Sequence, residues 1–177
     1  MCGIAGLFDI SGHESFDREL LAAMNQVQFH RGPDEGGEFL EPGVALGHRR
    51  LSIIDLSSGQ QPMHSADGKV CVVYNGEIYN YQELRETLIQ RGSRFCGHSD
   101  TEVLLAAVER WGLERAVQHF VGMFAFALWD RQENQLHLCR DRMGEKPLYY
   151  GYSQQTFLFA SELKAVQRHP DFVPEID

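Results

Sequence analysis

A nucleophile could lie at the second position of this 177-residue chain, where Cys2 follows Met1. Methionine aminopeptidases tend to remove Met1 when the next side chain is small, which would leave Cys2 with a thiol and a free α-amino group. In small reference compounds the amine titrates at about 7.7–8.0 and the thiol at about 8.5, so the amine can accept the proton of the thiol. One residue would then supply nucleophile and base. A second-position cysteine can equally be an accident of composition, so the rest of the sequence must show whether Cys2 is a nucleophile.

Six short motifs occur in order along the chain. They are MCGIAG at 1–6, RGPD at 31–34, GHRRLSIID at 47–55, NGEIYN at 75–80, SDTE at 99–102 and GMFAFA at 122–127. Together they resemble the class II glutamine amidotransferase domain, and specifically the glutaminase half of glutamine-dependent asparagine synthetases. The segment RDRMGEKPLYY at 140–150 continues the match, which covers nearly the whole chain with family-like spacings. The resemblance implies that Cys2 hydrolyses L-glutamine to L-glutamate and ammonia.

The resemblance assigns catalytic roles to Cys2, Asn75 and Gly76. Glutamine hydrolysis needs a thiolate, a proton donor for the departing ammonia and donors that stabilise a tetrahedral oxyanion. Asn75 and Gly76 match the oxyanion hole of the family, as a side-chain amide followed by a backbone N–H that a larger residue could obstruct. The alternative is a simple turn, because Asn-Gly is the commonest hairpin signal. Both interpretations can hold, since a turn can direct an N–H outward.

A glutaminase must also recognise the α-carboxylate and the α-ammonium of free glutamine. Arg50 matches the arginine that binds the carboxylate in the family, where a planar guanidinium suits the anion. Asp100 would pair with the ammonium, although the dipole of a helix capped by Ser99 favours an acid there anyway, by about 0.3–1 kcal/mol. Arg49 is interpreted as structural or solvated. The resemblance adds five more residues to the substrate-binding set: Leu51, Ser52, Ile53, Ile54 and Glu77.

Composition narrows the classes of function. The chain has 16 basic and 25 acidic residues and a formal charge of −9, which argues against nucleic-acid binding and against a polybasic membrane-surface protein. No apolar run approaches the roughly 18 residues of a membrane span, and the first residues do not resemble a signal peptide. The four cysteines are scattered, so a reducing cytoplasm is the expected compartment. No metal is expected, because Cys96 and His98 lack a second ligand pair at zinc spacing, and His30 and His48 are interpreted as structural.

Periodicity and capping signals predict three helices. Apolar residues at helical spacing indicate the first helix over residues 17–29. Asn80 and Glu83 indicate a capped start for the second, which should end at Gly92. Capping at Ser99 indicates the third, which should end at Gly112. The predicted strands are residues 2–8, 44–48, 70–75, 123–129, 136–140, 148–152 and 157–160.

The strand predicted at 123–129 indicates the architecture, because MFAFALW has apolar residues on both faces. Both faces must be covered, as in a strand inside a layered stack. A turn at 131–134 would join this strand to the next in an antiparallel hairpin, which excludes a purely parallel sheet. We therefore predict an α+β fold, a four-layer helix–sheet–sheet–helix sandwich with two mainly antiparallel sheets. The family's N-terminal-nucleophile (Ntn) hydrolase fold has these layers.

We expect residues 1–177 to form a single glutaminase domain, with residues 168–177 beginning a linker. Asparagine synthetases continue into an ATP-pyrophosphatase domain with a Ser-Gly-Gly-x-Asp-Ser phosphate loop, which does not occur in this sequence. ATP and Mg²⁺ are therefore expected only in that missing synthetase domain, and no cofactor in this one. The expected partners are L-glutamine and a synthetase domain in cis or in trans, with a homodimer as a further expectation.

Two alternatives remain open. Relatives in exopolysaccharide or exosortase gene clusters look similar, so the ammonia could amidate aspartate, a related carboxylate or another acceptor. The chain could also be a catalytically silent module that senses glutamine or docks a partner. A retained Met1 would favour that second alternative, because it blocks the amine of Cys2.

Overall fold

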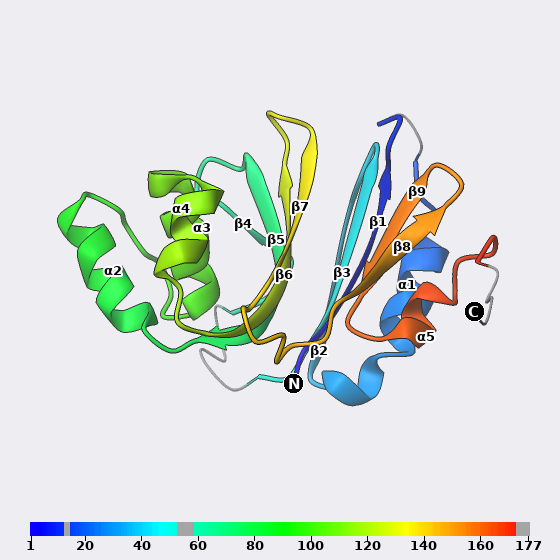
Figure 1. Ribbon diagram of the computed structural model, residues 1–177, viewed down its shortest axis with the longest axis horizontal. Helices are drawn as coiled ribbons and strands as arrows, with labels where there is room; N and C mark the ends of the chain where they lie inside the picture. Colours follow the sequence, from blue (N-terminus) through cyan, green and yellow to red (C-terminus); the bar gives the residue numbers. More distant parts are fainter. Residues whose placement is uncertain (13–14, 53–58, 173–177) are drawn as a thin grey trace.

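Two antiparallel sheets lie face to face in the computed structural model, which describes residues 1–12, 15–52 and 59–172 (Figure 1). The five-stranded sheet has the order β2-β3-β1-β9-β8, with β1 (Gly3–Asp9), β2 (Glu35–Glu41), β3 (Val44–Arg50), β8 (Tyr149–Ser153) and β9 (Thr156–Ala160). The four-stranded sheet has the order β4-β5-β6-β7, with β4 (Met63–His64), β5 (Val70–Ile78), β6 (Gly122–Asp130) and β7 (Gln135–Arg140).

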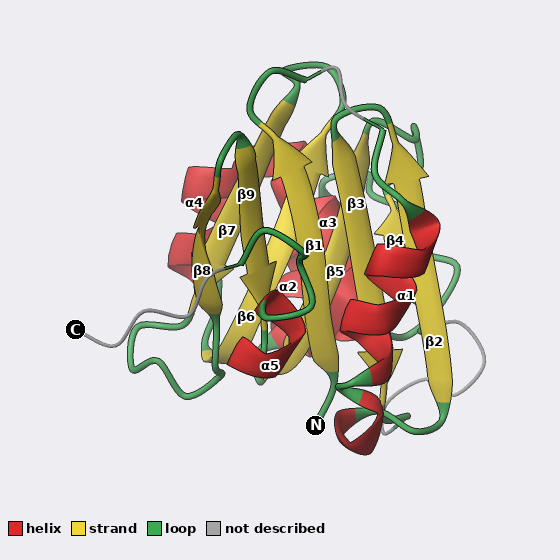
Figure 2. Cartoon of the chain, turned by 90° about the vertical axis from the view of Figure 1, so that its right-hand side faces the viewer, coloured by secondary structure: helices red, strands yellow, loops and turns green. Residues whose placement is uncertain are grey.

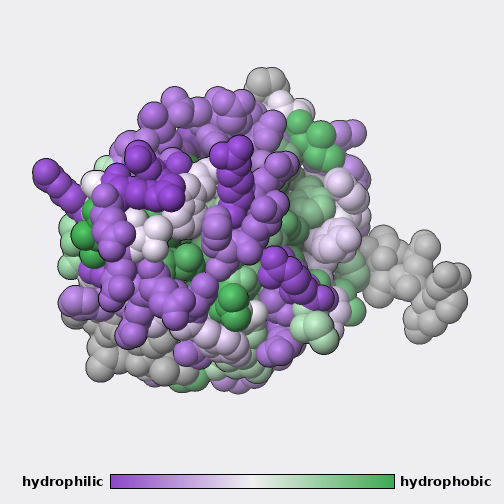
Figure 3. Space-filling model, turned by 60° about the vertical axis from the view of Figure 1, so that its left-hand side comes forward, coloured by the Kyte–Doolittle hydropathy of each residue, from purple (hydrophilic) through white to green (hydrophobic). Residues whose placement is uncertain are grey.

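Helices cover the outer face of each sheet. The five-stranded sheet carries α1 (Arg18–Gln26) and α5 (Leu163–Val166), which lie in front of its strands in Figure 2. The four-stranded sheet carries α2 (Tyr81–Gln90), α3 (Asp100–Trp111) and α4 (Leu113–His119) (Figure 1). The surface on that side is mainly hydrophilic, with hydrophobic residues in small separate areas (Figure 3), because the helices turn their apolar faces inward. The predicted four-layer α+β sandwich is confirmed.

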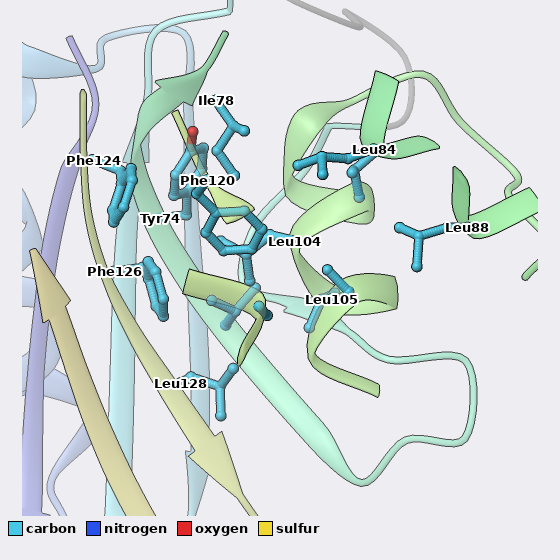
Figure 4. Packing of buried hydrophobic residues seen from close by; sticks show 14 residues of the cluster. Tyr74, Ile78, Leu84, Leu88, Leu104, Leu105, Phe120, Phe124, Phe126 and Leu128 are labelled. Carbon is cyan, nitrogen blue, oxygen red and sulfur yellow. The ribbon is translucent and has the colours of Figure 1, made fainter. Parts of the chain in front are cut away.

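Strand β6 buries both of its faces, as its sequence predicts. Phe124 and Phe126 point toward the helices and belong to the same cluster as Leu104 of α3 (Figure 4). Ala125 and Trp129 point the other way, into the cluster between the two sheets. Side chains of β6 thus alternate between the two hydrophobic clusters, so this strand contributes to both. Burying each large apolar side chain contributes roughly 1.5–3 kcal/mol to stability.

The first predicted helix ends three residues early. Asp17 caps α1, because its carboxylate accepts a hydrogen bond from the N–H of Glu19 at 2.9 Å. Regular helix stops at Gln26, and the buried side chain of Gln28 donates to the carbonyl of Ile4 at 3.2 Å. The short 3₁₀ helix η1 (Phe29–Arg31) follows. Residues 27 and 28 of the predicted helix therefore form a turn that contacts β1 through Gln28.

The other two helices differ in how they begin. Ser99 caps α3 by accepting a hydrogen bond from the N–H of Glu102 at 3.2 Å, as predicted. Asn80 occupies the N-cap position of α2, as predicted, but its side chain makes no capping hydrogen bond there. Its amide instead accepts from the N–H of Val121 at 3.1 Å and donates to the carbonyl of His119 at 3.0 Å, which joins the start of α2 to the start of β6.

Several elements differ from the sequence-based expectation. The strand predicted at 70–75 continues to Ile78, so Asn75-Gly76 lies inside β5 and the interpretation as a turn is wrong. Elements that were not predicted are β2, β4, α4 and α5, because β2 is polar and rich in glycine and the others are short. Residues 173–177 of the predicted linker lie outside the described residues.

Candidate active site

The N-terminus lies at one end of the sandwich, between the two sheets (Figure 1). Met1 and Cys2 line a pocket at this end. Its volume is about 140 Å³, against roughly 30 Å³ per molecule in liquid water, which is enough for a ligand of amino-acid size. The two residues before β1, the end of β3, strand β5 and the first turn of α3 meet here. The lining consists of Met1, Cys2, Arg50, Leu51, Gly59, Gln61, Tyr74, Asn75, Gly76, Glu77, Ser99, Asp100, Thr101, Met123 and Lys146.

Cys2 lies in this pocket directly before β1, with its side chain partly buried. Its Sγ accepts a hydrogen bond from the N–H of Leu51 at 3.5 Å and lies 3.8 Å from the carbonyl oxygen of the same residue. From the other side, Arg31 Nε donates to the carbonyl of Cys2 at 2.9 Å. Gly32 lets this loop approach β3, because an added Cβ would lie 2.3 Å from the carbonyl carbon of Arg49. Leu51 thus contacts the thiol of Cys2, and Arg31 holds its backbone.

A charged cluster anchors Arg31. Its Nη1 lies 3.1 Å from Glu162 Oε1, and His30 Nε2 and Lys164 Nζ approach the same carboxylate at 2.8 and 2.9 Å. Burial alone would raise the pKa of Glu162, but hydrogen bonds from Lys164, His30 and Arg31 outweigh it and lower the pKa to about 2. Glu162 therefore stays ionised at neutral pH and holds Arg31 against the backbone of Cys2.

Asn75 presents a buried amide to the pocket. Its side chain is on β5, the residue is 1% exposed, and Nδ2 has no hydrogen-bond partner within the described part of the chain. Leaving such a group unpaired costs about 1–3 kcal/mol, and buried amides are normally paired. The next residue, Gly76, lies so close to β6 that an added Cβ would be 2.5 Å from the carbonyl oxygen of Met123. Strand pairing therefore requires this glycine.

Arg50 is the last residue of β3, and its buried side chain lines the pocket. Its Nη1 donates to Glu35 Oε2 at 2.8 Å. Glu35 begins β2 and stands directly opposite Arg50 in the pairing of the two strands. A guanidinium held in this way keeps a planar face of donors at the pocket wall, which suits a carboxylate.

Asp100 forms the second charged feature of the pocket. Its Oδ2 accepts hydrogen bonds from the hydroxyl of Tyr74 at 2.7 Å and from the N–H of Ile78 at 3.0 Å. Both donors are neutral. Burial raises the pKa of Asp100, although these hydrogen bonds oppose the shift, and burial with the adjacent carboxylate raises the pKa of Tyr74 well above its usual value. A cationic ligand at this point would favour the ionised form of Asp100.

Most of the residues predicted for the site line this one pocket: Cys2, Arg50, Leu51, Asn75, Gly76, Glu77 and Asp100. Ser52 is not part of the lining, and its N–H donates to Asp34 Oδ2 at 2.8 Å in the 31–34 loop. Ile53 and Ile54 lie outside the described residues.

Several lining residues with polar side chains are not in the predicted site set, among them Tyr74, Gln61 and Lys146. Gln61 Oε1 accepts a hydrogen bond from the backbone N–H of Tyr74 at 2.6 Å, and so pairs a backbone donor of β5. Lys146 belongs to the segment that extended the family resemblance, but nothing local in that segment places it near Cys2. Only tertiary contacts bring it there.

The residues interpreted as structural lie in structural contacts. His48 is buried, and its Nε2 lies 3.1 Å from the carbonyl oxygen of Tyr74. Arg49 points away from the pocket, where its Nη2 donates to Gln26 Oε1 at 2.6 Å. Among the described residues, no three His, Cys, Asp or Glu side chains are grouped so that they could hold a metal ion. No helix in that part of the chain is both long and apolar enough to cross a membrane.

Curated relatives share much of this sequence. The chain is 41% identical over 180 residues to asparagine synthetase [glutamine-hydrolyzing] 3 of Bacillus subtilis, covering 100% of this chain and 29% of that protein. It is 44% identical to asparagine synthetase [glutamine-hydrolyzing] 1 of Bacillus subtilis, covering 94% and 26%, and 39% identical to asparagine synthetase B [glutamine-hydrolyzing] of Escherichia coli, covering 94% and 30%. The chain therefore spans less than a third of the length of these relatives.

Solved structures and a family model agree with these similarities. The glutamine phosphoribosylpyrophosphate amidotransferase of Bacillus subtilis superimposes with a TM-score of 0.76 at 24% identity, over 94% of this chain and 43% of that one, which shows the same fold. The sequence model described as "Glutamine amidotransferase domain" matches residues 1–177. The resemblance inferred from the motifs is confirmed, and the chain belongs to the glutamine amidotransferase domain family.

Proposed function

We propose that this chain is a glutaminase in which Cys2, exposed by removal of Met1, hydrolyses L-glutamine to L-glutamate and ammonia. The observation that carries the proposal is the Asn75 amide, which is buried in the pocket that also contains the Cys2 thiol and whose Nδ2 has no hydrogen-bond partner among the described residues. A donor held without a partner beside a nucleophile suits a negative charge that develops only during the reaction. The names of the glutamine-hydrolysing relatives support glutamine as the amide.

The proposed reaction has two stages. The α-amine of the processed Cys2 takes the proton of the thiol, and the thiolate attacks the side-chain carbonyl carbon of glutamine. Asn75 Nδ2 and the N–H of Gly76 stabilise the oxyanion while the ammonium of Cys2 returns its proton to the departing ammonia. Water then attacks the thioester and loses a proton to the amine, which releases glutamate and restores the thiol.

Arg50 and Asp100 would recognise the two charges of the free amino acid. The guanidinium of Arg50, held by Glu35, would bind the α-carboxylate. The carboxylate of Asp100, held by Tyr74 and Ile78, would bind the α-ammonium and regain the electrostatic stabilisation that burial removes. The remaining substrate-binding residues in the proposal are Leu51, Ser52, Ile53, Ile54 and Glu77.

The ammonia would serve a synthetase domain joined in cis or in trans. The names of the relatives favour asparagine synthesis. We propose aspartate as the acceptor, with ATP and Mg²⁺ bound in that other domain and no cofactor in this one. Four unpaired cysteine thiols in the structure suit a reducing cytoplasm. A purified synthetase domain that makes asparagine only when this chain and glutamine are added would test this assignment.

Intact mass spectrometry tests the glutaminase itself. We expect the mature protein to lack Met1 and to form a single adduct with a diazoketone analogue of glutamine, on Cys2. Cys71 should not react, because burial raises the pKa of its thiol to about 12. Cys2→Ala should lose both the adduct and ammonia release while still binding glutamine, whereas Cys96→Ala, which removes an exposed thiol outside the pocket, should keep both activities.

One result would overturn the glutaminase. A processed protein that forms no adduct and releases no ammonia from glutamine is not a hydrolase. If that protein still binds glutamine, measured by calorimetry, the chain is the silent sensing module described as an alternative above.

A further inference from the structure

Lys146 is a buried cation in the pocket to which no role has been assigned. The residue is 5% exposed, and its Nζ lies 3.5 Å from Met1 Sδ, so the ammonium points at the N-terminal residue. None of the ion pairs found among the described residues includes Lys146. Burying a charge without a counter-charge is costly, so this position needs a physical reason other than stability.

The loop before β8 fixes the backbone of Lys146 from both sides. Asp141 Oδ2 accepts from the N–H of Lys146 at 3.1 Å and Asp141 Oδ1 from the N–H of Glu145 at 2.9 Å. Arg140 donates to the carbonyl oxygens of Lys146 and Gly144, both at 2.6 Å. Gly144 has a φ of +67°, which lets the loop fold back over Arg140. The loop therefore fixes the backbone from which the Lys146 side chain extends toward Met1.

The other charged and titratable groups of the pocket have their own partners or lie at its edge. Arg50 is paired with Glu35, and the carboxylate of Asp100 is held by Tyr74. Glu77 is half-buried on β5, and the remaining groups near the N-terminus are Arg31 on the carbonyl of Cys2 and Asp141 and Glu145 in the loop of Lys146. Among these groups, Lys146 is the one whose side chain contacts Met1, at 3.5 Å, whereas Arg31 bonds the carbonyl oxygen of Cys2 at 2.9 Å.

Building on the proposed function, we propose that Lys146 is a positioning residue for catalysis, whose fixed ammonium keeps the α-amine of the processed Cys2 unprotonated. Removal of Met1 takes away the thioether that Lys146 contacts and leaves the new amine in the same part of the pocket. A fixed positive charge nearby disfavours a second one, so the amine more readily releases its proton to solvent. The same charge favours the thiolate that forms when the amine takes the proton of the thiol.

The pH dependence of Cys2 alkylation tests this role without glutamine. The protein is first shown by intact mass to lack Met1, and the rate of adduct formation on Cys2 with iodoacetamide is then measured across the pH range. Lys146→Met should move the midpoint of this profile upward by about one pH unit, and the midpoint of kcat/KM for glutamine with it. Lys146→Arg, which keeps the charge, should restore both midpoints. Lys69→Met, at an exposed turn where Lys69 pairs with Asp67, is the matched control and should change neither.

Two results would overturn the proposal. Unchanged midpoints in Lys146→Met would show that the ammonium does not act on Cys2. A raised KM with an unchanged pH profile would place Lys146 on the substrate instead. If wild type releases no ammonia but the alkylation midpoint still shifts, the glutaminase fails and the effect of Lys146 on Cys2 stands, so the two proposals are tested separately.

Discussion

The amide of Asn75 has a position that stability alone does not explain. A strand residue that is 1% exposed would ordinarily be apolar or fully paired, yet Nδ2 lacks a partner within the described residues. Folding must offset an unpaired donor of this kind, at about 1–3 kcal/mol. A transition-state oxyanion would repay that cost only during the reaction, so the residue should affect turnover more than binding or stability.

Replacement of Asn75 by alanine should therefore lower kcat. Loss of one oxyanion-hole donor costs about 10²–10³-fold, so Asn75→Ala should reduce kcat by that order and leave the KM for glutamine nearly unchanged. The thermal unfolding midpoint should not fall, because an unpaired amide is removed. Asn80→Ala is the matched control, since it removes an exposed amide that bridges His119 and Val121 outside the pocket, and it should keep the kcat of wild type. Wild-type kcat in Asn75→Ala would exclude Asn75 from the oxyanion hole.

At this scale the sequence identifies residues that lie in matched motifs and misses those that reach the site through tertiary contacts. Cys2, Arg50 and Asp100 were assigned by motif and line one pocket. Tyr74 lies in the strand predicted at 70–75, and its hydroxyl matters because α3 brings Asp100 within 2.7 Å of it. Lys146 is 144 positions from Cys2 in sequence, so no local pattern could connect them.

Strand β5 shows how a whole element is adapted to the site. Asn-Gly is typical of turns, but here Asn75-Gly76 continues in strand, with Asn75 opposite Ala125 and Gly76 opposite Phe124. The glycine is needed because the backbone of β6 occupies the place of a side chain. One element thus combines a buried amide with a strand pairing that only glycine permits.

An alanine at position 76 should separate β5 from β6. Its Cβ would lie 2.5 Å from the carbonyl oxygen of Met123 and 2.7 Å from Phe124 Cα, so the strands must shift, at a cost of about 1–3 kcal/mol in the free energy of unfolding. Gly151→Ala on β8 is the matched control, because an added Cβ there meets nothing within 4 Å. Urea denaturation should show the loss for Gly76→Ala alone, accompanied by lower ammonia release. Equal stability of the two variants would refute the steric argument.

An element that the sequence did not predict, β2, is determined by contacts with residues far away in the sequence. Strand β2 has little apolar pattern, and Gly37 within it allows the chain to approach so closely that an added Cβ would overlap the carbonyl oxygen of Gln61. Glu35 at the start of β2 stands opposite Arg50 of β3, with which it forms an ion pair. In contrast, β6 was predicted correctly because its own run of consecutive apolar residues indicates burial on both faces.

For the molecule as a whole, the pocket depends on how the two sheets are docked. Cys2 and Arg50 belong to the five-stranded side, and Asn75 to the four-stranded side. His48 connects the sheets directly, since its ring on β3 bonds the carbonyl oxygen of Tyr74, the neighbour of Asn75 on β5. Whatever weakens this connection should weaken both the fold and the site.

Acid should destabilise the docked sheets, because a protonated His48 would bury a charge between them. Burial lowers the pKa of His48 from 6.5 to about 4, with a smaller contribution from the charge of Arg50, while the bond to Tyr74 opposes the shift. Between pH 6.5 and about 4 the unfolded chain binds a proton at this residue and the folded chain does not, so the free energy of unfolding should fall as the pH falls, by about 3 kcal/mol in total. Urea denaturation of wild type and His48→Gln at several pH values isolates this contribution, because the other titrating groups are common to both proteins. The variant should lose about 3 kcal/mol less than wild type across this window, and parallel curves would mean that His48 is not held neutral between the sheets.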